Sequence, residues 1–321
     1  MMQEKKPLLI LTGPTAVGKT ALSIKLAKAV GGEIISADSM QVYRGMDIGS
    51  AKVKKEEMGG IPHYLIDVME PDEEFNVVRF QSMAKDAMER IYAKGKIPIL
   101  VGGTGFYIQS VLYDIDFTEQ DEDTAYREEL ERIAREQGSG VLHEKLRAAD
   151  PASAEKIHPN NIRRTIRALE FYEKSRIPIS EHNKKEAAKE SPYAFCYFVL
   201  NDEREKIYER ISLRVDRMLG EGLVEEVRAL LGRGLTKDMV SMQGLGYKEI
   251  LSWLGGEISY EEAVRILKRD TRHFAKRQLT WFRREKDVIW VNKPDFDYDD
   301  EKIIAFMTGK LKDRIGPARF A

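Results

Sequence analysis

The chain has 321 residues, about two domains by length, with 42% hydrophobic and 33% charged residues and a formal net charge of −1, a balance typical of globular proteins. No apolar run approaches the roughly 20 residues of a membrane span, and the N-terminus leads into a strand without the apolar stretch of a secretory signal, so we expect a cytoplasmic protein that does not bind membranes. The single cysteine, Cys196, excludes a disulfide framework, and the five histidines lack the close spacing of a zinc site.

A phosphate-binding loop pattern, G-x-x-x-x-G-K-[ST], occurs near the N-terminus. It comprises Gly13, Pro14, Thr15, Ala16, Val17, Gly18, Lys19 and Thr20. An apolar run precedes it and apolar residues at helical spacing follow it, which is the strand, loop and helix context that the motif needs. Backbone N–H groups, the helix N-terminus and Lys19 attract an anion, and Thr20 offers a hydroxyl to Mg²⁺. The loop predicts a diphosphate or polyphosphate site with Mg²⁺ as cofactor, and it leaves the reaction open.

Strands and helices alternate over the first third of the chain. We expect strands over residues 7–12, 33–37, 64–68 and 96–101, and helices over residues 19–30, 76–94 and 105–113. This alternation predicts an α/β fold, a P-loop NTPase-like parallel sheet flanked by helices. Its ligands are expected beyond the carboxyl ends of the strands.

Two further strand ends carry polar or glycine-rich sequences. Asp38 follows the second strand; Asp is common as a turn residue there, but its place at the mouth of the sheet favours a catalytic carboxylate. Residues 102–105 contain three glycines and Thr104. Such a turn suits a second phosphate contact or the edge of a substrate, and a tight strand-to-helix turn explains the glycines equally well.

From about residue 114 the pattern changes to helices alone. We expect them over residues 121–137, 142–149, 151–157 and 161–174, followed by a charged, loop-like stretch over residues 180–191. A helical segment that interrupts an alternating chain indicates an insertion that covers the site or holds a second substrate. The expected domains are a catalytic core of residues 1–117 and 191–321 and a helical insertion of residues 118–190.

The last part returns to the sheet with a strand over residues 194–200. We expect helices over residues 204–220, 224–232, 247–254 and 260–286, then a strand over residues 288–291 and a peripheral tail after Asn292. The long helix is basic, with eight Lys or Arg and one acid between residues 263 and 284.

One face of the long helix carries the positive charge. The basic face holds Arg265, Arg269, Arg272, Lys276 and Arg283, and the packing face Ala263, Leu267, Phe274 and Trp281. A second basic group, Arg163, Arg164 and Arg167, lies in the expected insertion. Charge runs are usually solvated surfaces, but two one-sided basic elements favour a long polyanion such as RNA.

Several segments in combination resemble the bacterial tRNA dimethylallyltransferases, also called tRNA isopentenyltransferases. They are, in order, residues 13–20, 38–43, 45–52, 101–107, 158–160 with Arg164 and Arg167, 246–247 and 275–283. Residues 38–43 together with 276–283 are the most specific. Gln243 departs from the pattern, since relatives often carry Arg there, and residues 105–106 vary among relatives. No zinc finger of the eukaryotic kind follows Arg283, as expected of a bacterial-type enzyme.

The resemblance implies transfer of a dimethylallyl group from dimethylallyl diphosphate to N6 of adenosine 37 of tRNA. It implies catalytic roles for Asp38 as the base, Thr104 as a hydrogen-bond partner of the adenine, and Lys19 on the leaving diphosphate, with Mg²⁺ on Thr20. The target base is expected to be flipped out of its stack. The expected tRNA-binding residues are Asp38, Ser39, Met40, Gln41, Thr104, Arg127, Arg163, Arg164, Arg167, Gln243, Tyr247, Lys276, Arg277, Gln278 and Arg283.

Three alternatives remain open from the residues. A small-molecule or nucleoside kinase uses the same loop and a helical lid, but it leaves the basic segment over residues 276–283 without a purpose. A prenyl transferase acting on a free adenine nucleotide needs neither the insertion nor the basic helix. A non-enzymatic RNA-binding NTPase leaves Asp38 and Thr104 unexplained. We expect a monomer whose partners are tRNA and dimethylallyl diphosphate.

Overall fold

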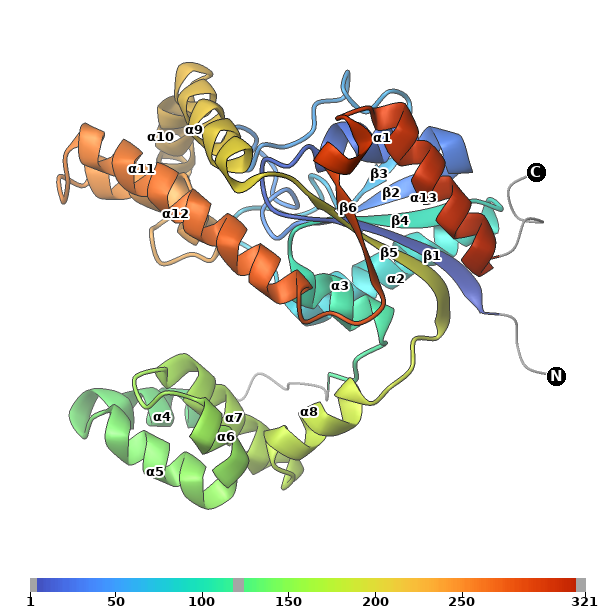
Figure 1. Cartoon of the computed structure of the whole chain (residues 1–321). Helices are drawn as coiled ribbons and strands as arrows, with labels where there is room; N and C mark the ends of the chain where they lie inside the picture. The colour runs from blue at the N-terminus through green and yellow to red at the C-terminus, as the bar shows by residue number, and fades with distance from the viewer. Residues whose placement is uncertain (1–4, 118–123, 316–321) are drawn as a thin grey trace. The chain divides into compact units, whose positions relative to one another are not determined.

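The computed structural model describes residues 5–117 and 124–315, and the chain divides into two compact units (Figure 1). The core unit comprises Met1–Leu112 and Pro192–Ala321, and the helical unit comprises Tyr113–Ser191. The expected limits of the helical insertion were residues 118 and 190. Each unit has its own buried cluster of apolar side chains.

The core unit is built on one six-stranded sheet in the order β3-β2-β4-β1-β5-β6, in which every pair of neighbours is parallel. The strands are β1 Lys6–Thr12, β2 Gly32–Ala37, β3 His63–Tyr64, β4 Ile97–Gly102, β5 Tyr193–Asn201 and β6 Val288–Asn292. The predicted parallel α/β fold is confirmed. The expected strand over residues 64–68 is wrong, because Leu65 and Asp67 have φ angles of 63° and 54°, which end the extended conformation.

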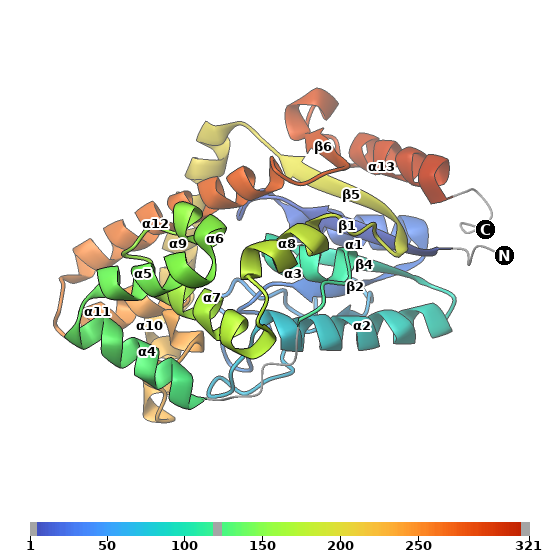
Figure 2. The same cartoon turned by 90° about the horizontal axis from the view of Figure 1, so that it is seen from below.

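Helices cover both faces of this sheet, and Figure 2 shows α2 and α13 on opposite sides of its strands. The helices of the core unit are α1 Lys19–Val30, α2 Val77–Ala93, α3 Gly105–Leu112, α9 Arg204–Gly220, α10 Leu223–Gly232, α11 Tyr247–Leu254, α12 Tyr260–Phe282 and α13 Asp300–Ile315, with short 3₁₀ turns η1 Ser241–Gln243 and η2 Lys293–Phe296. The apolar faces of α1, α2, α3 and α13 bury the sheet, which leaves the carboxyl ends of the strands to carry the loops.

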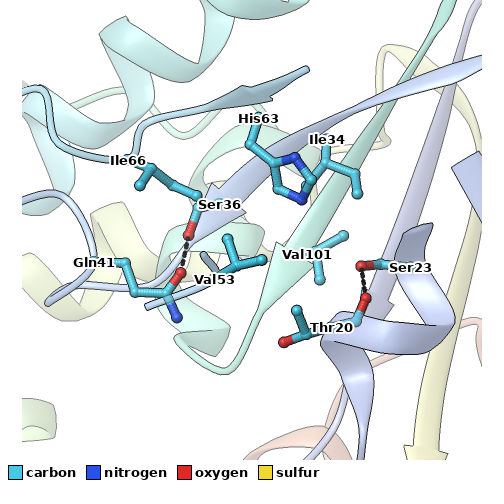
Figure 3. Close-up of a pocket in the computed structure, with 9 residues that line it drawn as sticks. All are labelled: Thr20, Ser23, Ile34, Ser36, Gln41, Val53, His63, Ile66 and Val101. Carbon is cyan, nitrogen blue, oxygen red and sulfur yellow. Dashed lines mark hydrogen bonds between the residues drawn. The ribbon is translucent and has the colours of Figure 1, made fainter. Parts of the chain in front are cut away.

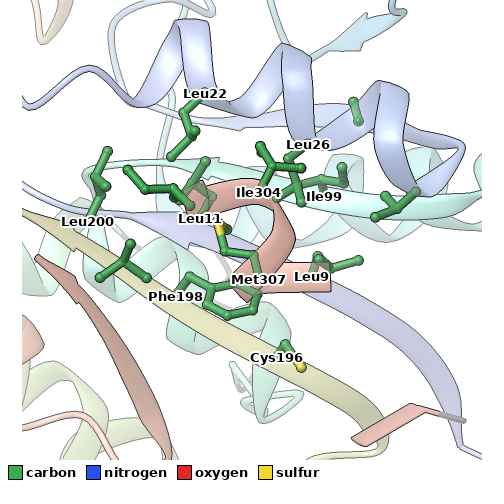
Figure 4. Packing of buried hydrophobic residues seen from close by; sticks show 14 of the residues in the cluster. Leu9, Leu11, Leu22, Leu26, Ile99, Cys196, Phe198, Leu200, Ile304 and Met307 are labelled. Atoms are coloured by element: carbon green, nitrogen blue, oxygen red, sulfur yellow. The ribbon is translucent and has the colours of Figure 1, made fainter. Parts of the chain in front are cut away.

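Helix α13 corrects the expectation of a peripheral tail. Its side chains Ile303, Met307 and Leu311 are fully buried, and Met307 packs with Leu9 of β1 and Phe198 of β5 (Figure 4). Apolar residues four apart give the helix one apolar stripe, and that stripe covers β5. Cys196 lies in the same cluster, where burial raises the pKa of its thiol to about 11, as expected of a core thiol.

The helical unit contains α4 Thr124–Glu136, α5 Ser139–Ala149, α6 Pro151–Lys156, α7 Ile162–Ser175 and α8 Ile179–Ala187. Leu130, Leu142, Leu146 and Leu169 are the centre of its core. The expectation of a loop over residues 180–191 is wrong for residues 180–187, which belong to α8, and only residues 188–191 lie outside a helix. The Asp150 carboxylate accepts hydrogen bonds from the backbone of Ser153 and Ser180, at 3.0 and 2.9 Å, and so fixes the start of α8. The expected start of α4 at residue 121 lies outside the described residues. Across residues 5–117 and 124–315, no helix has the length and apolar character to cross a membrane.

The buried carboxylate of Glu33 in β2 stabilises one edge of the sheet. Glu33 is 1% exposed and accepts hydrogen bonds from Lys94 at 2.9 Å, Lys96 at 2.8 Å and Tyr64 at 2.7 Å. Burial raises the pKa of Glu33, but the three hydrogen bonds outweigh it and lower the pKa from 4.5 to about 2. The ionised carboxylate therefore stabilises the fold above pH 4.5, and this contribution is lost as the pH falls from about 4.5 towards 2.

Glu33→Gln is expected to lower the free energy of unfolding by about 1–3 kcal/mol at pH 7, because the amide weakens the charge-assisted bonds. The difference in the free energy of unfolding between the variant and the unmodified protein should shrink as the pH falls below 4.5, because the stabilisation by the ionised Glu33 carboxylate is then lost. Urea denaturation between pH 3 and 7 measures both effects. Glu89→Gln, at an exposed carboxylate paired with Lys6, is the matched control. A difference that is the same at every pH would contradict this account of Glu33.

Candidate active site

The phosphate loop lies at the carboxyl end of β1 and packs closely against the chain around it. Gly13 has φ 145°, and a β-carbon there would lie 2.3 Å from the carbonyl oxygen of Leu200 in β5, so a larger residue does not fit. Ala16, at the middle of the loop, packs against Ile207 and Ile211 of α9 and Ala275 of α12. The loop is therefore held from the sheet side by β5 and from the other side by two helices.

Two cations lie at this loop. The Lys19 ammonium donates to the carbonyl oxygens of Gly13 and Pro14, at 2.9 and 2.8 Å. Burial, and after it the charge of Arg214, lower the pKa of Lys19 to about 7 against the opposing effect of Asp38. Arg214 of α9 donates to the Thr15 hydroxyl at 3.3 Å, and its pKa is lowered by burial and by Arg217. Arg214 was not predicted from the sequence, because one arginine in an amphipathic helix carries no signal of its own.

Thr20 is the second residue of α1 and is exposed. No group of three or more His, Cys, Asp or Glu side chains suited to a metal occurs in the described parts of the chain. Mg²⁺ in phosphate sites commonly takes one or two protein oxygens, with the remaining positions filled by water and phosphate. A single hydroxyl beside a phosphate loop fits that kind of Mg²⁺ site and does not fit a cage made by protein side chains alone.

Asp38 and Thr104, predicted from two different strand ends, belong to neighbouring turns. The Asp38 carboxylate accepts hydrogen bonds from the backbone of Met40 at 2.8 Å and Gln41 at 3.4 Å. The backbone N–H of Thr104 donates to the carbonyl oxygen of Ala37, at 3.3 Å. Because Ala37 directly precedes Asp38, this bond places the glycine-rich turn beside the carboxylate. Both side chains are half-buried.

Gln278 of α12 joins the phosphate loop to the glycine-rich turn. Its Oε1 accepts from the backbone N–H of Thr15 at 2.8 Å, and its Nε2 donates to the carbonyl oxygen of Gly103 at 3.0 Å. The side chain is only 6% exposed. A β-carbon on Gly103 would lie 2.1 Å from this Nε2, so the glycine is required for the approach. In this structure Gln278 holds two loops together instead of facing solvent, although the sequence analysis expected a contact to tRNA.

Helix α12 has an inner and an outer face. The inner face is buried and consists of Ala263, Leu267, Thr271, Ala275, Gln278 and Phe282. Phe274, expected on that face, is half-buried beneath the Arg277 guanidinium. Trp281, also expected there, is half-buried and packs edge-on against Phe106, with 6.3 Å between the ring centroids.

The outer face of α12 is only partly neutralised. Arg265 pairs with Glu262, and Arg269 pairs with Asp270. Four further basic side chains form no ion pair with any residue of ranges 5–117 and 124–315. They are Arg272, Lys276, Arg277 and Arg283. These four cations are the basic surface that α12 presents to solvent.

The remaining candidate residues of the core unit have local partners. Tyr247 is fully buried, and its hydroxyl donates to the Glu226 carboxylate at 2.7 Å. Glu226 also accepts from the backbone N–H groups of residues 47, 48 and 49, at 2.9, 2.8 and 3.0 Å. The exposed Gln243 donates to the carbonyl oxygen of Lys237. Ser39, Met40 and Gln41 are half-buried. Tyr247 thus holds the loop over residues 47–49 in place and has no surface for RNA.

In the helical unit the candidate arginines differ. Arg127 forms a bidentate pair with Glu170, at 2.8 and 2.9 Å, so its guanidinium fork is already occupied. Arg163, Arg164 and Arg167 of α7 are exposed. The structure therefore leaves the α7 arginines available to an anion and gives Arg127 a partner inside its own unit.

A small cavity of about 30 Å³ adjoins Thr20 (Figure 3). Its polar walls include Ser36, whose hydroxyl donates to Gln41 at 3.4 Å, and His63, whose pKa is lowered by burial. Ile34, Val53, Ile66 and Val101 form its apolar walls. The cavity is large enough for one or two water molecules beside the first turn of α1.

Comparisons with known proteins agree with one another. The family model described as IPP transferase matches residues 41–285. A tRNA dimethylallyltransferase of Lachnoclostridium phytofermentans is 64% identical over 294 residues, 92% of this chain and 94% of the relative, and one of Acetivibrio thermocellus is 52% identical over 296 residues, with the same coverage.

Solved structures show the same likeness. The tRNA isopentenylpyrophosphate transferase of Bacillus halodurans is 45% identical with a TM-score of 0.71, covering 97% of this chain and 98% of its own. A eukaryotic dimethylallyltransferase acting on tRNA is 30% identical with a TM-score of 0.83, covering 96% of this chain and 80% of its own.

Proposed function

This chain belongs to the IPP transferase family, and on that premise we propose that it transfers a dimethylallyl group from dimethylallyl diphosphate to N6 of adenosine 37 of tRNA. The resemblance inferred from the motifs is confirmed by the relatives. One observation of the structure carries the proposal: the phosphate loop, Asp38 and Thr104 are joined by the Ala37–Thr104 and Gln278 hydrogen bonds. This arrangement offers a diphosphate site and a carboxylate in one region of the core unit.

We propose that the loop holds the diphosphate as a leaving group. Lys19 bonds two carbonyl oxygens of its own loop, and an incoming anion offers it stronger, charge-assisted partners. Arg214 adds a second positive charge from α9. Breaking the bond between C1 and oxygen develops negative charge on the diphosphate, and these fixed cations and the loop amides stabilise that charge. Mg²⁺ held through Thr20 would neutralise the diphosphate further.

Asp38 is proposed as the proton acceptor. The N6 lone pair of adenine is delocalised into the ring, so the amine becomes acidic only as its bond to C1 forms, and a nearby base must then take the proton. The backbone bonds from Met40 and Gln41 orient the Asp38 carboxylate and leave lone pairs for the amine. Thr104, in the adjoining turn, is proposed to hydrogen-bond the adenine. The base must be flipped out of its stack to reach this carboxylate.

For tRNA we propose two sets of contacts. The first is the outer face of α12, with Lys276, Arg277 and Arg283, and the second is Arg163, Arg164 and Arg167 of α7 in the helical unit, which contacts the anticodon stem-loop. Ser39, Met40, Gln41 and Gln243 are proposed to line the path of the loop nucleotides. Gln278, Tyr247 and Arg127 are proposed to act as positioning residues through the partners described above. We also propose that the protein acts in the cytoplasm, where its tRNA substrate occurs, and that it acts as a monomer.

The substitutions Gln278→Ala and Lys276→Ala test the roles of the inner and outer faces of α12 separately. Loss of the Gln278 bridge frees the Thr15 amide and the Gly103 carbonyl, and we expect a ten- to hundredfold lower kcat with little change in tRNA affinity. Lys276→Ala is expected to weaken tRNA binding and to reduce its salt dependence by about one phosphate contact, with kcat preserved. Single-turnover rates and tRNA binding at several salt concentrations measure both. Equal effects of the two variants on tRNA affinity would contradict the assignment of Gln278 to the inner face.

The proposed function is tested by mixing the protein, Mg²⁺ and labelled dimethylallyl diphosphate with either unmodified tRNA or AMP. Label is expected in the tRNA and not in AMP. Label in AMP would keep the prenyl chemistry and remove the role of the basic surfaces. If neither acceptor is labelled and [γ-³²P]ATP instead labels a nucleoside, the kinase alternative replaces this proposal.

A further inference from the structure

We infer that the phosphate loop also binds guanosine nucleotides, with the guanine base recognised by the turn Asn292-Lys293-Pro294-Asp295 after β6. This inference concerns a ligand other than the prenyl diphosphate, and of the proposed function it needs only the phosphate loop as an anion site. The turn lies at the same edge of the sheet as that loop, because β6 pairs with β5 and β5 pairs with β1, all in parallel. A nucleotide anchored by its phosphates at one loop can therefore reach the neighbouring strand end with its base.

Lys293 connects the turn with the phosphate loop. Its ammonium lies 3.3 Å from the position that a β-carbon of Gly18 would occupy, so the side chain extends from the turn to the loop. Lys293 has no ion pair with any residue that the structure describes. Because the Lys293 ammonium lies beside the backbone of Gly18, it would lie near the phosphates and the ribose of a nucleotide bound at the loop. Its aliphatic stem is then able to cover one face of a planar base.

Asp295 supplies the selectivity. Asn292 accepts a hydrogen bond from Asn201 at 3.1 Å and donates one to Oδ2 of Asp295, also at 3.1 Å, so the carboxylate is held in a fixed direction from the end of the sheet. Asp295 is exposed, and none of the described cations pairs with it. The proline after Lys293 fixes the backbone at the start of η2. The carboxylate therefore retains free lone pairs for a ligand.

The chemistry of a carboxylate distinguishes among bases. Guanine presents two adjacent donors, N1–H and the N2 amino group, and a carboxylate accepts from both at once. Adenine presents the acceptor N1 next to its amino group, so a carboxylate gains one bond and meets one repulsive lone pair. A guanosine diphosphate placed here would share the loop amides and Lys19 with dimethylallyl diphosphate, and the two ligands would exclude each other.

Direct binding of GDP, ADP and inorganic diphosphate to the full chain in Mg²⁺, measured by titration calorimetry, tests the inference. GDP is expected to bind at least tenfold more tightly than ADP. Asp295→Asn should weaken GDP about tenfold, should strengthen xanthosine diphosphate, whose C2 carbonyl accepts from the new amide, and should leave inorganic diphosphate unchanged. Asp297→Asn is the control, because its carboxylate is also exposed but pairs with Lys302.

Two results would overturn recognition of guanine by this turn: GDP binding no tighter than ADP, or a guanine preference that Asp295→Asn leaves intact. Failure of the proposed prenyl transfer is distinguishable, since that reaction is read from label in tRNA and guanine selectivity from binding alone. If inorganic diphosphate itself does not bind, the phosphate loop has no anion site and both proposals fall.

Discussion

Asp38→Asn is expected to slow prenyl transfer to tRNA by about 10²–10⁴-fold, the usual contribution of a general base. Asparagine keeps an oxygen that accepts the hydrogen bonds from Met40 and Gln41, so the turn should retain its conformation. The amide does not take up a proton from N6, and the rate of the chemical step should fall. Diphosphate affinity should not decrease, because the substitution removes a negative charge close to Lys19 and Arg214.

Single-turnover transfer with labelled dimethylallyl diphosphate measures the chemical step, and separate titrations with tRNA and inorganic diphosphate measure binding. Asp72→Asn, at an exposed position of the same unit, serves as the matched control. A rate for Asp38→Asn within a few-fold of the unmodified protein would exclude this carboxylate as the base. A large loss of tRNA affinity in Asp38→Asn would instead assign it to positioning of the RNA.

Lys19→Met is expected to reduce diphosphate affinity by about 10- to 100-fold, because hydrogen bonds to charged groups contribute about 1.5–3 kcal/mol. The same substitution should raise the stability of the unliganded protein near pH 7. The pKa of Lys19 is about 7 in the fold against 10.5 in the unfolded chain. Between these values the unfolded state binds a proton that the folded state does not, so this residue costs stability at neutral pH, and the cost disappears as the pH rises towards 10.5.

The pH dependence of both effects is measurable. Thermal unfolding of the wild-type protein should gain more stability than that of Lys19→Met as the pH rises from 7 to 10. Titrations of diphosphate at pH 8 in buffers of different ionisation enthalpy should show uptake of about one proton by the wild type, since the bound anion restores the ammonium, and none by Lys19→Met. Equal proton uptake by both proteins would show that Lys19 is already charged before the anion binds.

Local patterns in the sequence determined much of this molecule. The phosphate loop, the strands that precede and follow it, and the parallel sheet follow from apolar periodicity and from glycines and a lysine at fixed spacing, which act within about one strand, loop and helix. The family followed from several such segments in a fixed order. Periodicity also placed the helices between residues 124 and 174 correctly in kind, because amphipathic spacing is a local property.

Tertiary structure decided which of these residues meet. Thr15 and Gln278 are 263 positions apart, and Arg214 reaches the loop across 199 positions, so no spacing along the chain indicates either contact. Tyr247 is buried because Glu226 and residues 47–49 surround it, and α13 belongs to the core because its apolar side chains pack on those of β5. A charged or aromatic side chain has the same local pattern whether it faces solvent, RNA or another loop. Only the packing of distant segments, which sets burial and supplies partners, distinguishes these cases.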